Sequence, residues 1–233
     1  FEVHSELSNQ NKEAFLDLLN QLVDETNQQI TQSTHFLITY GTSWVYRNIE
    51  TKQIVANCHK VPQKQFTKEL LSIECIEEAM QNTIALIQQL NPAVKFIFTV
   101  SPVRHIKDGF VKNQQSKAYL ISGIHEVLNT EHCKLNTVYF PSYEILLDEL
   151  RDYRFYAEDM LHPNKLAIDY IWQRFKETTI LEADWTVMEE VEAVQKSLSH
   201  RPFNPNSESH QTFLTKLQTR IATLQSEYPF MKF

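Results

Sequence analysis

The sequence is poor in several features that mark large classes of protein. Its 233 residues include only 3 glycines and 3 cysteines, and 22 Lys and Arg are outnumbered by 29 Asp and Glu, for a net charge of −7. That charge argues against a nucleic-acid-binding protein, which normally has a basic face, and against attraction to an anionic membrane surface. No apolar run approaches the length of a membrane-spanning helix, and no signal peptide is recognisable.

The few cysteines bear on metal binding and redox state, and the few glycines on the number of tight turns. Cys58, Cys75 and Cys133 are odd in number and form neither a CxxC motif nor a plausible zinc quartet. Reduced thiols in a cytoplasmic protein are the simplest interpretation. Glycine is scarcer than the tight turns of a compact α/β enzyme normally require, which suggests that a turn-rich segment lies outside this sequence.

Short apolar segments alternate with longer amphipathic ones. This alternation predicts an α/β domain whose parallel sheet has helices on both faces. Pro163 suits the first turn of a helix, and Asn113 is a plausible helix cap. We expect strands at 35–41, 95–100 and 137–140, a two-stranded excursion at 44–49 and 53–57, and helices at 10–32, 64–90, 114–130, 142–151 and 163–178.

The C-terminal part differs in kind, because segments 184–199 and 208–228 are helical and rich in polar residues, with no strand pattern. We therefore divide the chain into an α/β domain at 1–180 and a helical extension at 181–233. The extension is expected to pack on the α/β domain or to mediate self-association into a homo-oligomer.

The most distinctive local motif is Asp159-Met160-Leu161-His162, followed by Pro163. An Asp three residues before a His can place its carboxylate beside the imidazole, fix the tautomer, and leave the other ring nitrogen free to take a proton from a serine. A lone D-x-x-H also fits a surface Asp and His at a helix start, and without further context that interpretation is favoured.

The context is supplied by two earlier strands that also end in polar residues. One is followed by Gly41, Thr42 and Ser43, and the other leads to Arg104 and His105. Because ligands bind at the carboxyl ends of strands in an open parallel sheet, convergence of these ends with the D-x-x-H motif predicts an active site.

Arg104 and His105 remain open to two interpretations. They could contact an anionic or sugar substrate, or they could form a structural ion pair, for instance with Asp108 or Glu144. His59 could likewise line the cleft or belong to an ordinary exposed loop.

A series of motifs in fixed order resembles the GSCFA family over nearly the whole chain. These motifs are YGTSWVY, VANCHK, TVSPVRH, DGFVKNQQSKAYL, YFPSYEILLDELRDYRFYAEDMLHP and HRPFNP. The family takes its name from a Gly-Ser-Cys-Phe-Ala stretch that corresponds to the nucleophile block of SGNH hydrolases. The resemblance implies their fold, a flavodoxin-like three-layer α/β/α sandwich with a parallel sheet.

The resemblance also implies roles for individual residues. His162 would be the general base and Asp159 its orienting partner. Gly41 would match the glycine of the SGNH block Gly-x-Asn-Asp, but Thr42 and Ser43 follow it here, so the oxyanion-hole Asn is absent. Asn57, or the backbone N–H groups after Gly41, are the candidates to replace that Asn.

No Gly-Ser-Cys-Phe-Ala stretch occurs in the sequence. The layout of the family places this stretch, with the nucleophilic serine and the first, central strand, upstream of Phe1. The implied Ser-Asp-His triad would need neither a metal nor a cofactor.

Two hypotheses from different classes follow. The first is a serine ester hydrolase or acyltransferase that acts on a small or carbohydrate-linked acyl ester. The second is a binding or scaffold module that keeps the SGNH fold without turnover, an alternative favoured by the missing Asn after Gly41 and by the polar helical tail.

Overall fold

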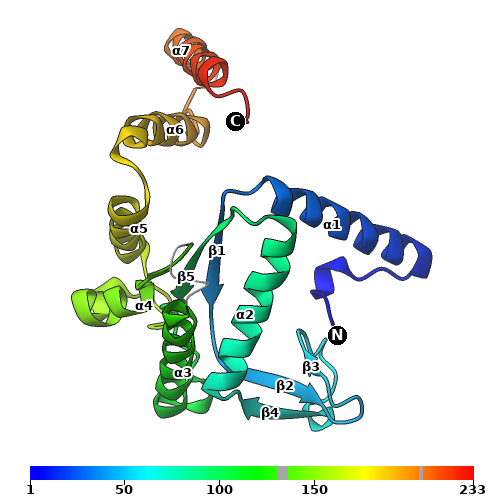
Figure 1. Ribbon diagram of the computed structural model, residues 1–233. Coiled ribbons are helices and arrows are strands. Elements are labelled where there is room, and N and C mark those ends of the chain that lie inside the picture. The colour runs from blue at the N-terminus through cyan, green and yellow to red at the C-terminus, as the bar shows by residue number, and fades with distance from the viewer. Residues whose placement is uncertain (131–135, 205–206) are drawn as a thin grey trace. The chain divides into compact units, whose positions relative to one another are not determined.

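The computed structural model describes residues 1–130, 136–204 and 207–233, so Cys133 lies outside the described residues (Figure 1). The chain divides into two compact units, Phe1–Ile171 and Trp172–Phe233. The division falls within helix α5 (Lys165–Thr179). Within the described ranges, no helix is long and apolar enough to cross a membrane.

The first unit is built on a parallel sheet, as the sequence predicts. Its three strands have the order β1-β5-β6. Four α-helices precede α5: α1 (Lys12–Gln32), α2 (Ile73–Leu90), α3 (Phe110–Asn129) and α4 (Ser142–Glu144), and α4 continues into π-helical turns at Ile145–Leu150. The strands are β1 (His35–Tyr40), β5 (Lys95–Val100) and β6 (Thr137–Phe140). With seven α-helices in the described chain, this α/β arrangement is compatible with a three-layer α/β/α fold.

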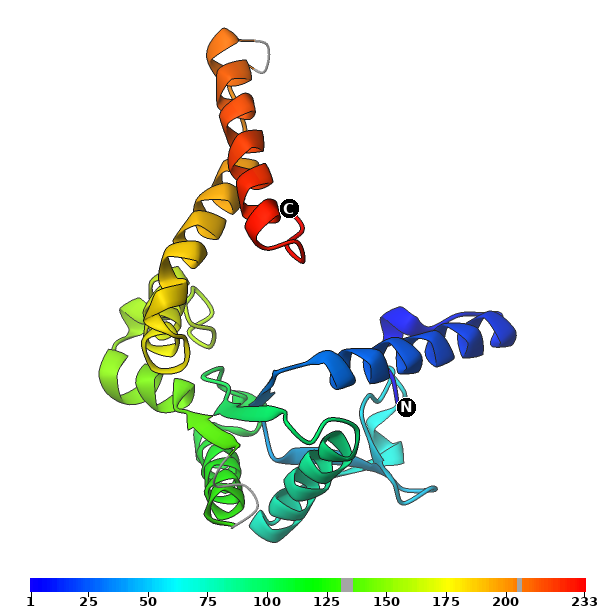
Figure 2. The ribbon, with the colours of Figure 1, turned by 45° about the horizontal axis from the view of Figure 1, so that its top comes forward.

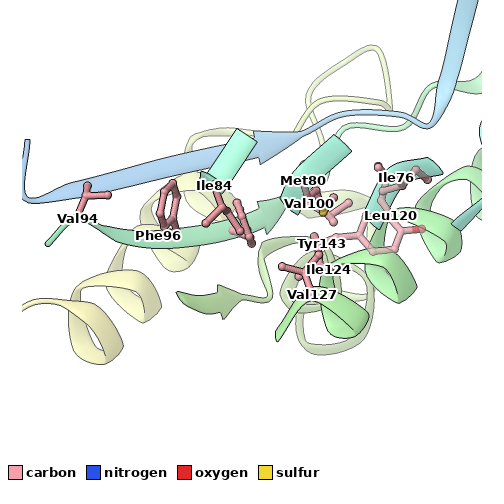
Figure 3. Packing of buried hydrophobic residues seen from close by; sticks show 11 residues of the cluster. Ile76, Met80, Ile84, Val94, Phe96, Val100, Leu120, Ile124, Val127 and Tyr143 are labelled. Carbon is pink, nitrogen blue, oxygen red and sulfur yellow. The ribbon is translucent and has the colours of Figure 1, made fainter. Parts of the chain in front are cut away.

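One face of the sheet carries the main hydrophobic core (Figure 3). Helices α2 and α3 lie together on that side of β1 and β5 (Figure 2). The buried residues of α2 recur every fourth position, which forms one apolar stripe on a helix. The core comprises Ile76, Met80, Ile84, Val94, Phe96, Phe98, Val100, Leu120, Ile124, Val127 and Tyr143.

The opposite face of the sheet is covered only in part. Leu37, Ile97 and Val138 stand in register across the three strands. Leu37 is 55% exposed and Val138 52% exposed, whereas Ile97 is buried. β1 pairs directly with β5 along its whole length, and no described strand pairs with the other edge of β1.

The two-stranded excursion is confirmed and gains a third strand. An antiparallel sheet has the order β3-β2-β4, with β2 at Trp44–Asn48, β3 at Ile54–Val55 and β4 at Phe66–Leu70. Figure 1 shows it beyond the carboxyl end of β1.

The predicted helix at 64–90 was therefore wrong over its first residues. Five residues of β4 pair with β2, which supplies the backbone hydrogen bonds that a helix would have provided internally. The helix begins only after Ser72, whose hydroxyl accepts a hydrogen bond from the Cys75 N–H.

Two predicted helix starts also need correction. Asn113 is not a cap, because α3 begins at Phe110, directly after Gly109 with its φ of +91°. Pro163 precedes α5, which starts at Lys165 and is capped by the Asn164 side chain. Short 3-10 turns lie at Ser5–Leu7, Gln63–Gln65, Ile106–Asp108, Tyr153–Phe155 and Glu182–Asp184.

The second unit is helical, as predicted for the tail. It contains α6 (Trp185–Leu198) and α7 (Glu208–Glu227), which pack through buried Val194, Leu217 and Leu224. An ion pair between Arg220 and Glu190, 2.6 Å long, also joins these two helices. Packing of this unit on the α/β domain and self-association through it stay predictions.

The contact between α2 and α3 gives a stability prediction. A Cβ added at Gly123 would lie 2.8 Å from the Ile76 Cγ2 atom, closer than side chains approach one another. We therefore expect Gly123→Ala to lower the free energy of unfolding by about 1–3 kcal/mol through overpacking, measured by urea denaturation. In the double variant with Ile76→Ala the two losses should be less than additive. An unchanged midpoint for Gly123→Ala would refute this close packing.

Candidate active site

The polar segments predicted from the sequence meet at a cavity beside the carboxyl ends of β1 and β5. Thr42 comes from the segment after β1, Arg104 and His105 from the segment after β5, and His162 from the D-x-x-H motif. The cavity has a volume of about 440 Å³, which is ordinary for a small-molecule site. Its remaining lining residues are Trp44, Tyr46, Lys68, Val103, Ile106, Lys107, Asp108 and Leu161.

Asp159 and His162 form the hydrogen-bonded pair that the motif predicts. The Asp159 Oδ2 atom lies 2.6 Å from Nδ1 of His162. Its Oδ1 atom accepts hydrogen bonds from the backbone N–H groups of Leu161 (2.9 Å) and His162 (3.0 Å). One carboxylate therefore fixes both the backbone and the imidazole of this turn.

These hydrogen bonds favour the ionised carboxylate. The backbone N–H groups of His162 and Leu161, and then the His162 ring, lower the pKa of Asp159 to about 2. Asp159 thus carries a negative charge throughout the neutral range and can stabilise an imidazolium.

The second ring nitrogen of His162, Nε2, is available to a ligand. Within the described chain, Nε2 has no hydrogen-bond partner, and the His162 side chain is 60% exposed. Of the described residues that line the cavity, Thr42 and Tyr46 carry hydroxyl groups and none is a serine. The described lining of the cavity therefore offers an accessible imidazole nitrogen but no serine hydroxyl.

A buried lysine joins the two strand ends beneath this site. Lys117, on α3, is fully buried, and its Nζ atom donates to the carbonyl oxygens of Gly41 (2.6 Å) and Ser101 (2.7 Å). Burial lowers the pKa of Lys117 to about 8. Because these carbonyls directly follow β1 and β5, this single side chain fixes the spacing of the two segments.

Ser116, next to Lys117, organises the segment after Gly41. Its Oγ accepts from the Ser43 N–H (2.8 Å) and contacts the Thr42 hydroxyl (2.9 Å). The Trp44 N–H donates to Oγ1 of Thr42 at 3.2 Å. The backbone N–H groups after Gly41 are candidate oxyanion donors. Those of Ser43 and Trp44 already donate hydrogen bonds, whereas the Thr42 N–H has no hydrogen-bond acceptor among the described contacts.

His105 lies over the same segment. Its Nε2 atom would be 3.5 Å from a Cβ added at Gly41, and its backbone N–H donates to Oδ1 of Asn113 at 2.8 Å. Desolvation, followed by the charges of Lys117, His162 and Lys107, lowers the pKa of His105. This imidazole is therefore disposed to be neutral at a site surrounded by cations.

Arg104 holds the D-x-x-H turn. Its guanidinium donates to the carbonyl oxygen of Met160 and lies 4.5 Å from the ring centroid of Tyr156. Met160 has a φ of +56°, which a non-glycine residue adopts only when its surroundings impose it. Arg104 thus connects the end of β5 to Met160, one of the two residues between Asp159 and His162.

The ion pairs considered for Arg104 from the sequence are not formed in the described chain. Asp108 pairs instead with Lys68, and the carboxylate of Glu144 accepts a hydrogen bond from the Tyr139 hydroxyl at 2.8 Å.

Asn57 and His59 lie elsewhere. The Asn57 side chain accepts from the His59 N–H at 2.8 Å, and the His59 ring lies 6.1 Å from that of Phe1. Neither is among the described residues that line the cavity, so the structure gives no support to Asn57 as an oxyanion donor.

The role of α3 at the site is not apparent from the sequence pattern, which marks Asn113 only as a plausible helix cap. Asn113, Ser116 and Lys117 are all buried. They continue, at helical spacing, the stripe formed by Leu120 and Ile124. Polar residues on a buried stripe beside strand ends were the signal that could have identified them.

In the described ranges, no group of three or more His, Cys, Asp or Glu side chains is arranged to hold a metal ion.

Two family descriptions match the sequence. The one described as "GSCFA family" matches residues 1–175, and the one described as "GSCFA domain protein, C-terminal domain" matches residues 191–233. No curated protein and no solved structure matches the chain.

Removal of the Lys117 amine tests its bridging role. In Lys117→Met the carbonyls of Gly41 and Ser101 lose their donor, which destabilises the fold by roughly 1–3 kcal/mol for each unsatisfied group. Part of this loss is offset because the variant no longer has to bury a charged ammonium group. We expect a net loss of about 1–4 kcal/mol in urea denaturation. Lys165→Met, at an exposed pair with Asp169, should change stability by less than about 0.5 kcal/mol. Unfolding of Lys117→Met at wild-type urea concentrations would contradict the bridge.

Replacement of Arg104 should loosen the D-x-x-H turn without unfolding the sheet. In Arg104→Gln the cation–π contact with Tyr156 and the charged donor to Met160 are lost, so amide exchange at Leu161 and His162 should accelerate about tenfold. Hydrogen exchange followed by NMR measures this, with the Ile97 amide of β5 as an internal reference. Equal exchange at the turn in both proteins would mean that Arg104 does not hold it.

Proposed function

The chain belongs to the GSCFA family, and from this premise we propose that it provides the base of an SGNH-type serine ester hydrolase or acyltransferase. The substrate class is a small or carbohydrate-linked acyl ester. The observation that carries the proposal is the Asp159–His162 pair, whose geometry suits a general base with an orienting carboxylate.

The proposed chemistry assigns one role to each member of the triad. A serine Oγ attacks the ester carbonyl while Nε2 of His162 takes its proton, and Asp159 stabilises the imidazolium. The imidazolium then protonates the departing alkoxide, which leaves an acyl-serine. Water or an acceptor alcohol, deprotonated by His162, attacks this acyl group, and the imidazolium returns the proton to the departing serine Oγ. The serine belongs to the Gly-Ser-Cys-Phe-Ala stretch that gives the family its name.

The oxyanion would form near the segment after Gly41. The N–H of Thr42 is the candidate donor there, since Ser116 and Thr42 occupy the next two N–H groups. Lys117 would not contact the oxyanion directly. It would hold the Gly41 carbonyl and thereby set the position of the following peptide.

A non-catalytic binding module is the second candidate function. It is favoured by the absence of an Asn after Gly41 and by the occupied N–H groups of Ser43 and Trp44. Both leave fewer donors for an oxyanion than an acyl-transfer enzyme normally presents.

Labelling with a fluorophosphonate distinguishes the two. The protein is isolated at its natural length, its intact mass is compared with the 27.4 kDa of this chain, and the labelled residue is located by peptide mass spectrometry. We expect one labelled serine, outside residues 1–233. His162→Gln and Asp159→Asn should lower the labelling rate by about 10²-fold or more, because the serine loses its base.

The matched control is His4→Gln. His4 is also an exposed histidine beside a carboxylate, 3.7 Å from Glu6, but it lies outside the cavity lining. Its labelling rate should equal that of the wild type. An unlabelled protein would leave the binding-module hypothesis in place, whereas equal labelling in wild type and His162→Gln would show that His162 is not the base of the labelled serine.

A further inference from the structure

The charges around the cavity differ in sign from those of the whole chain. Three of the lining side chains are cationic, Lys68, Arg104 and Lys107, whereas one, Asp108, is a carboxylate. The chain itself has a net charge of −7. The cavity is therefore a locally positive region on an acidic protein.

Only one of these cations is neutralised in the described chain. Lys68 forms an ion pair with Asp108, so the one carboxylate of the described lining is already paired. Arg104 donates to a neutral carbonyl and lies over the Tyr156 ring, so its charge is not cancelled. Lys107 is exposed and is not in an ion pair among the described residues, although its charge acts on neighbouring Asp108, which pairs with Lys68. Two positive charges thus remain to act on a ligand.

The lowered pKa of His105 is consistent with a positive potential at the cavity. Besides desolvation, the charges that lower its pKa are those of Lys117, His162 and Lys107. Asp159, the carboxylate beside the lining residue His162, is already hydrogen-bonded to the His162 ring and to two backbone N–H groups. A negative charge brought by a ligand would meet several cations and no free carboxylate of the described lining.

The rest of the lining is apolar or aromatic. Trp44 and Tyr46, from β2, form part of the wall, and Val103, Ile106 and Leu161 provide aliphatic surface. Lys68 lies 5.3 Å from the Trp44 ring centroid and 5.8 Å from that of Tyr46, so the aromatic wall also holds a cation in place. The antiparallel sheet therefore supplies a mixed apolar and cationic surface.

We propose that the ester bound in this cavity carries an anionic group, a carboxylate or a phosphate, held by Lys107 and Arg104 beside His162. This inference rests on the proposed function for the presence of an ester, and extends it by naming the charge of the substrate. The aromatic wall of β2 would contact the uncharged part.

The test compares two esters of similar shape and different charge. Monomethyl succinate carries a carboxylate where methyl levulinate carries an acetyl group. Binding to the 233-residue chain is followed by NMR shifts of the Trp44 indole and the His105 and His162 rings. We expect Kd for the anion to be at least about tenfold lower, and the difference to shrink in 0.5 M salt because the charges are exposed. Equal binding of the two esters, or no binding of the anion, would overturn the proposal.

A third probe, methyl phosphonoacetate, distinguishes a phosphate-bearing substrate from a carboxylate-bearing one. Tighter binding than monomethyl succinate would assign a phosphate-bearing substrate, and weaker binding a carboxylate-bearing one.

Two lysine variants distinguish the effect of a charge at the cavity from the effect of the overall charge of the protein. Lys107→Gln should raise Kd for the preferred anion about threefold to tenfold and leave Kd for methyl levulinate unchanged. Lys165→Gln removes the same charge from an exposed position outside the lining and should leave both unchanged. Equal effects of the two substitutions on anion binding would contradict a local site.

Turnover is read separately as methanol release by the natural-length protein. Anion binding without methanol release or serine labelling would refute the hydrolase and keep the anion site. Methanol release from methyl levulinate as fast as from monomethyl succinate would keep the hydrolase and refute the anionic substrate.

Discussion

A buried ammonium group holds together the two segments on which the candidate site is built. The Nζ atom of Lys117 donates to the carbonyl oxygens that follow β1 and β5, at Gly41 and Ser101. An unpaired lysine at this depth would be strongly unfavourable, so the charge and the two carbonyls stabilise one another only in this arrangement. Ser116, one residue earlier on α3, fixes the next peptides by accepting from Ser43. The rigid core beneath the sheet therefore extends into a polar layer at the strand ends.

The D-x-x-H turn is held in a different way. Asp159 and His162 are both substantially exposed, and their mutual contact is local in sequence. What connects the turn to the strand ends is Arg104, through the Met160 carbonyl and the Tyr156 ring. The long side chain of Arg104 thus attaches the turn of His162 to the strand ends, while the Nε2 atom of His162 has no hydrogen-bond partner among the described residues.

Charge and shape at the cavity are consistent with the proposed chemistry. Cations surround His105 and leave the site positive, whereas the rest of the chain is acidic. A positive site stabilises both an anionic substrate and the oxyanion of acyl transfer, because each places negative charge where no free carboxylate of the described lining competes. The wall of β2 adds the apolar surface that a small ester needs. In the proposed function, the nucleophile is the serine of the Gly-Ser-Cys-Phe-Ala stretch after which the family is named.

The sequence by itself determined the elements with strong periodic patterns and the Asp159–His162 pair, because a motif of four residues closes its own hydrogen bonds. It also indicated that the polar strand ends belong together, since parallel strands end at one edge. Only the tertiary structure decided that Lys117 bridges those ends and that β4 is a strand. Both depend on partners outside the local segment. β4 is extended because β2 lies beside it, and Lys117 is stable when buried because the carbonyls of Gly41 and Ser101, 76 and 16 residues away, accept its hydrogen bonds.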